Sequence, residues 1–101
     1  MILQVGVKAF LRNKEGKYLL LKRNMEKYKG AKGAWDLVGG RIDPGAPLIE
    51  NLKREVREET QMEIISEPRL IYAQDILHFI DKHVVRLTYI ADSKGEVVLD
   101  T

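Results

Sequence analysis

The sequence contains no cysteine, and none of its apolar runs approaches the roughly 20 residues of a membrane-spanning helix. Without cysteine there are no disulfides, thiolate metal ligands or cysteine nucleophiles, which suits a reducing compartment. The first residues also lack the basic segment and the small-residue cleavage site of a signal peptide. We therefore expect a cytoplasmic protein with no membrane partner.

Charge is unevenly distributed along the chain, although its net value is only +2. Residues 1–35 contain nine lysines and arginines but only two acidic residues, whereas residues 36–101 contain eight basic and thirteen acidic residues. A basic segment beside an acidic one suits a polyanion that is bridged by a cation. A lysine-rich loop that is simply solvated would give the same charge pattern, so charge alone decides nothing.

Only one segment has a convincing helical pattern. Pro47 suits the first turn of a helix that runs to Thr60, with a buried stripe made of Leu48, Ile49, Leu52 and Val56. The apolar run 18–21 is typical of a central strand that is covered on both faces. With one helix among many strands, the chain is predicted to be a single α+β domain with a mixed sheet. The predicted strands are residues 3–11, 18–21, 35–38, 62–65, 70–79, 84–91 and 96–99.

Acidic side chains crowd the C-terminal half of the predicted helix. Glu55, Glu58 and Glu59 are three or four residues apart in two of their pairs, where like charges repel, and the helix dipole disfavours acids at this end. At about 100° per residue they fall beside the buried stripe. A divalent cation would offset the repulsion, and an all-oxygen ligand set favours Mg²⁺ or Mn²⁺. The alternative is a solvated acidic helix terminus.

The double glycine Gly39–Gly40 precedes the helix and lets backbone approach a ligand closely. Together with the helix it resembles the Nudix hydrolase family. The segment Trp35–Gly40 is similar to the family's approach to its motif. The motif, called the Nudix box, is matched in spacing by Gly40, Arg54, Glu55, Val56, Glu58, Glu59 and Met62.

The resemblance implies an α/β/α sandwich of Nudix type and a metal-dependent hydrolase. Water would attack the pyrophosphate linkage of a nucleoside diphosphate joined to another group. Glu58 and Glu59 would be metal ligands, with the carbonyl of Gly39 as a further ligand. Glu55 would be a ligand or the general base, and Arg54 would orient a carboxylate. The catalytic candidates are thus Arg54, Glu55 and Glu58, and the metal candidates are Gly39, Glu55, Glu58 and Glu59.

Two residues depart from the Nudix box. Ala46 stands where the family has a glutamate that pairs with the box arginine, so Arg54 lacks that partner. Asp43 or Glu50 could substitute, although neither matches the motif. Gln61 stands at the glycine of the helix exit, where a left-handed conformation would cost about 1 kcal/mol.

The chain also ends where the family's helix over the second sheet face would begin. We therefore expect a C-terminally truncated domain over residues 1–101 that lacks this helix, and the uncovered face predicts a homodimer. The alternative to an active enzyme is a Nudix-like domain that binds nucleotides and catalyses weakly or not at all. An unrelated alternative is a nucleic-acid-binding module over residues 8–32, which the acidic helix disfavours.

The substrate is expected to be a small nucleotide, whose identity the motif leaves open. Arg23 and Lys32, from the basic first third of the chain, are candidate phosphate contacts, and Arg41 is a third because it follows the glycine turn directly. Trp35 at the start of a predicted strand is expected to pack in the core rather than to stack on a base.

Overall fold

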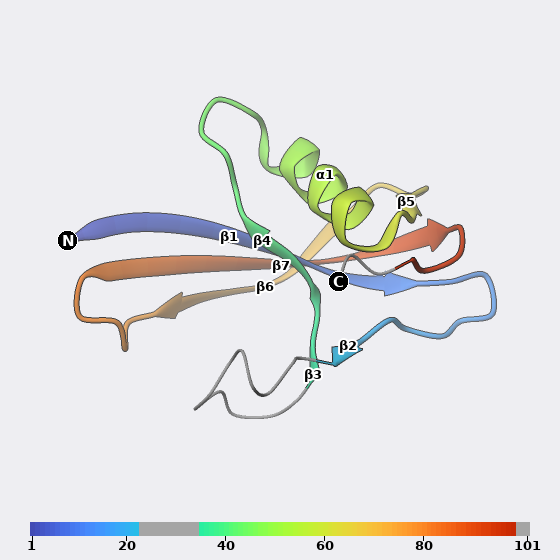
Figure 1. Ribbon diagram of the computed structural model, residues 1–101, viewed down its shortest axis with the longest axis horizontal. Coiled ribbons are helices and arrows are strands. Elements are labelled where there is room, and N and C mark those ends of the chain that lie inside the picture. The colour runs from blue at the N-terminus through green and yellow to red at the C-terminus, as the bar shows by residue number, and fades with distance from the viewer. Residues whose placement is uncertain (23–34, 99–101) are drawn as a thin grey trace.

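Two long parallel strands form the centre of the main sheet (Figure 1). They are β1 (Ile2–Arg12) and β7 (Lys82–Lys94), in a computed structural model that describes residues 1–22 and 35–98. β4 (Val38–Arg41) pairs antiparallel with β1, on the side away from β7. β5 (Glu63–Ile64) and β6 (Arg69–Ile76) pair antiparallel with β7. The five strands therefore make the mixed sheet that the sequence predicts.

The helix α1 (Leu48–Thr60) lies against one face of this sheet, over the paired strands β4 and β1 (Figure 1). Alternate residues of β1 are buried beneath it because successive side chains of a strand point to opposite faces. Leu52 and Val56 of the predicted stripe are fully buried, and Leu48 and Ile49 pack at the margin of the core. The buried apolar core consists of Val7, Ala9, Leu11, Val38, Leu52, Val56, Met62, Tyr89 and Ala91.

The ends of α1 refine the predicted boundaries. Pro47 is the residue before the helix rather than part of its first turn, and its extended backbone leads into Leu48. Gln61 follows the helix in the left-handed conformation, with φ 61° and ψ 13°, and its N–H donates to Arg57 O at 2.9 Å. The departure at Gln61 thus keeps the exit geometry that a glycine would adopt more easily. In the part of the chain that the structure describes, no helix is long and apolar enough to cross a membrane.

Several predicted strands differ from those observed. The run 18–21 is not a central strand: only Leu21 is in a strand, β2 (Leu21–Lys22), which pairs with β3 (Trp35–Asp36) outside the main sheet. The predicted strand 35–38 is interrupted at Leu37, so β3 and β4 belong to different sheets. β7 continues to Lys94, beyond the predicted end at residue 91, and residues 96–98 of the predicted strand 96–99 form no strand, while residue 99 lies outside the described residues. Local apolar runs predicted these segments poorly because strand pairing decides where a strand ends.

Candidate active site

The two glycines of β4 lie between β1 and α1. Gly39 has a φ of 149°, and a Cβ there would overlap the carbonyl oxygen of Val7, so only glycine fits. A Cβ at Gly40 would lie 2.9 Å from a carboxylate oxygen of Glu55. The double glycine therefore brings β4 close to the neighbouring strand and to an acidic side chain of the helix.

The two glycines lie within strand β4, so the turn expected from the sequence is not formed there, and Glu59 reaches them from the last part of α1. Its Oε2 accepts a hydrogen bond from the N–H of Gly39 at 3.3 Å. Burial raises the pKa of Glu59, and the Gly39 N–H and the charge of Lys8 oppose this only in part. Glu59 is therefore a partly buried carboxylate that holds its proton more firmly than an exposed one.

Lys8 is a positive charge beside these acids that the sequence did not distinguish from the other basic residues. The pairing of β1 with β4 places Lys8 opposite Gly39. Its Nζ lies 3.0 Å from Asp36 Oδ2 and also donates to the carbonyl of Leu37. The ammonium group is largely buried, so its charge acts on Glu59 with little screening.

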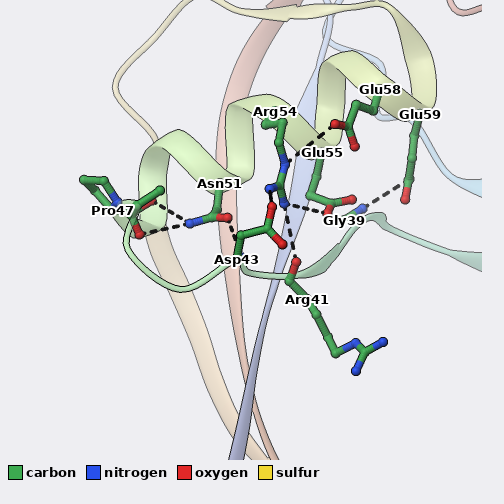
Figure 2. A network of polar contacts seen from close by, with 10 residues as sticks. Gly39, Arg41, Asp43, Pro47, Asn51, Arg54, Glu55, Glu58 and Glu59 are labelled. Atoms are coloured by element: carbon green, nitrogen blue, oxygen red, sulfur yellow. Dashed lines mark hydrogen bonds and ion pairs between the residues drawn. The ribbon is translucent and has the colours of Figure 1, made fainter.

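Arg54 connects the acids of the helix to the loop that precedes it (Figure 2). Its Nη2 donates to Glu55 Oε1 at 2.9 Å, and its Nη1 contacts Asp43 Oδ2. Its Nε lies 3.8 Å from Glu58 Oε1. Burial by itself lowers the pKa of Arg54, but the acids, Asp43 first, outweigh it and hold the pKa above its ordinary value.

Asn51 is a site residue that the sequence analysis missed. It is 1% exposed, and its Oδ1 accepts from the N–H of Asp43 at 2.8 Å. Its Nδ2 donates to the carbonyls of Ala46 and Pro47, each at 3.0 Å. The loop 43–47 is thus fixed from within the helix. The sequence could have indicated this role, because Asn51 is a polar residue beside the apolar stripe of the helix. A polar side chain that is buried there needs hydrogen-bond partners.

The candidate metal ligands share a region but are not gathered around one point. Figure 2 shows Glu55 and Glu59 near the Gly39 backbone and Glu58 directed to Arg54. Within residues 1–22 and 35–98, no three histidine, aspartate or glutamate side chains lie close enough together to hold a metal ion. The donors nevertheless fit a hard divalent cation chemically, because all are oxygens and the glycine cradle admits the carboxylate of Glu55. Arg54 contacts only the Oε1 atoms of Glu55 and Glu58, so their Oε2 atoms could serve as ligands.

The remaining candidates are less closely connected to the carboxylates. Arg41 presents its carbonyl oxygen to Arg54, while its exposed side chain extends away from the acids (Figure 2). Arg23 and Lys32 lie outside the described residues. Trp35 is 61% exposed, so the expectation that it packs in the core is wrong. Its strand β3 pairs with β2 outside the main sheet, which takes the indole away from the core.

Comparison with known proteins identifies the family of this chain. The family model described as the NUDIX domain matches residues 2–101. A nucleoside triphosphatase NudI from Salmonella agona strain SL483 is 34% identical over 85 residues. This alignment covers 83% of the present chain and 54% of the relative, so the chain spans about half the length of the curated relatives it matches.

Solved structures show the same fold. A MutT NUDIX hydrolase from Burkholderia pseudomallei superposes with a TM-score of 0.78 at 25% identity, covering 98% of this chain and 74% of the other. A MutT protein from Methanosarcina mazei Go1 gives a TM-score of 0.76 at 27% identity, with coverages of 98% and 70%. The chain belongs to the Nudix hydrolase family. Its α+β fold is that of the family, whose members generally use divalent metal ions.

The raised pKa of Glu59 predicts how stability depends on pH in metal-free buffer. Glu59 ionises near its ordinary value of 4.5 in the unfolded chain but at higher pH in the folded protein. Folding therefore takes up a proton between the two pKa values, and this group lowers stability as the pH rises through that window. In Glu59→Gln the amide oxygen can still accept the hydrogen bond from Gly39, but the side chain no longer ionises. The loss of stability with rising pH should therefore disappear.

Urea unfolding at intervals from pH 4 to pH 8 measures the effect. The free energy of unfolding of Glu59→Gln relative to wild type should rise as the pH increases. Glu67→Gln is the control, because it also replaces one carboxylate by an amide but does so at an exposed position outside the site. Parallel profiles for the wild type and Glu59→Gln would show that burial does not act on this carboxylate.

Proposed function

We propose that the protein is a metal-dependent hydrolase that cleaves the pyrophosphate linkage of a nucleoside diphosphate joined to another group. The observation that supports this most is the placement of Glu55 and Glu59 against Gly39 and Gly40 of β4. The related nucleoside triphosphatases make nucleoside triphosphates the first substrate class to test. We also propose that the substrate is a small nucleotide and that the protein is located in the cytoplasm.

Mg²⁺ or Mn²⁺ would be held by Glu55, Glu58, Glu59 and the carbonyl oxygen of Gly39. Such an ion supplies charge neutralisation at the phosphates and lowers the pKa of a bound water. Glu55 either completes the ligand set or accepts the proton of the attacking water. Arg54 donates to Glu55 Oε1 at 2.9 Å and so holds this carboxylate in one orientation beside Gly40. Arg41, Arg23 and Lys32 remain candidates for contact with phosphate oxygens.

The alternative is a domain that binds nucleotides without turning them over efficiently. Its main support was Ala46, because the box arginine would lose its carboxylate partner. Asp43 contacts Arg54 in the structure, so this argument is weaker than the sequence suggested. A nucleic-acid-binding module over residues 8–32 receives no support from the site, whose acids would repel phosphates in the absence of a cation.

The enzyme reading predicts Mg²⁺- or Mn²⁺-dependent release of phosphate or pyrophosphate from a panel of nucleoside triphosphates and other nucleoside diphosphate derivatives. Glu58→Gln and Glu59→Gln should reduce turnover to background, because each removes a proposed ligand charge. Glu67→Gln, which removes an exposed acid, serves as the control. Full activity of both ligand variants would refute the metal assignment. Metal-dependent nucleotide binding without turnover by the wild type would favour the binding domain.

The homodimer expected from the sequence stays a prediction, and we propose the edge strand β6 as its contact. Leu70, Ile71 and Tyr72 of β6 are each about half exposed. Among the strands in residues 1–22 and 35–98, β6 pairs only with β7, and an apolar edge strand favours association. Light scattering should give the mass of two chains for the wild type and of one chain for Tyr72→Lys. A wild-type monomer at tens of micromolar would contradict the proposal.

A further inference from the structure

Arg54 has a carboxylate partner in the loop between β4 and α1, although Ala46 occupies the glutamate position of the motif. Its Nη1 contacts Asp43 and its Nη2 donates to Glu55, so the guanidinium bridges an acid of the loop and an acid of the helix. The Arg54 side chain is 29% exposed and that of Asp43 is 74% exposed, so solvent screens this contact more than the contact with Glu55. Glu50, the other possible substitute, is exposed in the first turn of α1 and forms no ion pair with Arg54.

The position of Asp43 is fixed by Asn51 rather than left to a solvated loop. The Asn51 amide binds the N–H of Asp43 at one end of the loop and the carbonyls of Ala46 and Pro47 at the other. Because Asn51 is fully buried, breaking these hydrogen bonds would leave polar groups unpaired inside the protein. The loop therefore presents Asp43 to Arg54 in a defined conformation.

We propose that Asp43 is a positioning residue: it replaces the glutamate that is missing from the motif as the carboxylate partner of Arg54. This inference rests on the proposed hydrolase function and adds to it. Arg54 also lies near Glu58, so a guanidinium without Asp43 would turn more fully to Glu55 and Glu58 and compete with a metal ion for their oxygens. Asp43 holds Nη1 from the opposite side and keeps the helix acids available.

The variant Asp43→Asn tests this with little change in volume. Partners that orient the ligands of a metal typically contribute 10- to 100-fold to metal affinity or activity. We therefore expect kcat, and the affinity of the protein alone for Mn²⁺ by calorimetry, each to fall by about 10- to 100-fold. The KM for the nucleotide should change little, because Asp43 acts through Arg54. Glu50→Gln is the matched control: it removes an exposed acid close by and should behave as the wild type.

Rescue from the motif position distinguishes positioning from a general loss of charge. Adding Ala46→Glu to Asp43→Asn should restore kcat and Mn²⁺ affinity, because the new carboxylate can meet Arg54 from the same loop. Ala46→Glu alone should change little, since Arg54 already has a partner. An Asp43→Asn variant that matches Glu50→Gln would overturn the proposal, as would a folded double variant that remains impaired.

A measurement on the metal-free protein separates this inference from the proposed function. The side-chain N–H signals of Arg54 in a nitrogen-15 NMR spectrum should be protected from solvent exchange in the wild type, lose protection in Asp43→Asn and regain it with Ala46→Glu. If the wild type neither binds Mn²⁺ nor hydrolyses nucleotides, the proposed function fails while these signals still report on Asp43. If the wild type is active and the Arg54 signals ignore Asp43, only the positioning role fails.

Discussion

Repulsion among three carboxylates on α1 is the constraint around which the site is arranged. Glu55, Glu58 and Glu59 occupy a little more than one helical turn at the end where the dipole disfavours anions. Two neighbours stabilise them: Arg54 contacts Glu55 and Glu58, and the backbone N–H of Gly39 donates to Glu59. Lys8 adds a positive charge from β1. These partners hold the acids in the absence of metal, and a divalent cation would compete with them.

The backbone determines where that cation would lie. Gly39 passes so close to β1 that a side chain cannot be accommodated, and Gly40 leaves room for the carboxylate of Glu55. Antiparallel pairing with β1 holds β4 beside the parallel pair β1–β7, and the buried side chains of Leu52 and Val56 hold α1 against the sheet. Packing of the apolar core therefore sets the distance between the two glycines and the acids, which is how the fold serves the site.

The elements with a strong local pattern were predictable from the sequence. The stripe of α1, the alternation in β1 and the spacing of Arg54 and Glu55 from Gly40 are properties of short segments, and the structure contains the predicted helix and mixed sheet. The run 18–21 was misread because an apolar run does not reveal whether a strand finds a partner in the main sheet. Its β2 pairs with β3 instead.

The partners of the site residues depended on contacts that no local pattern contains. Asp43 and Glu50 were equivalent substitutes in the sequence, and the loop geometry set by Asn51 distinguishes them. Lys8 differs from the other lysines of the first third through the register of β1 with β4. Recognition of the motif identified the acids, while the folded chain was needed to show what holds them.

The central claim is that the helix acids and the two glycines of β4 together form one site for a divalent cation. Substoichiometric Mn²⁺ added to the nitrogen-15-labelled protein tests it most directly, because a paramagnetic ion broadens the signals of nearby nuclei. The account predicts that the amide signals of Gly39, Gly40 and residues 55–59 broaden first, and that excess Mg²⁺ restores them. Broadening that begins elsewhere, or that spreads evenly over the exposed acids, would contradict it.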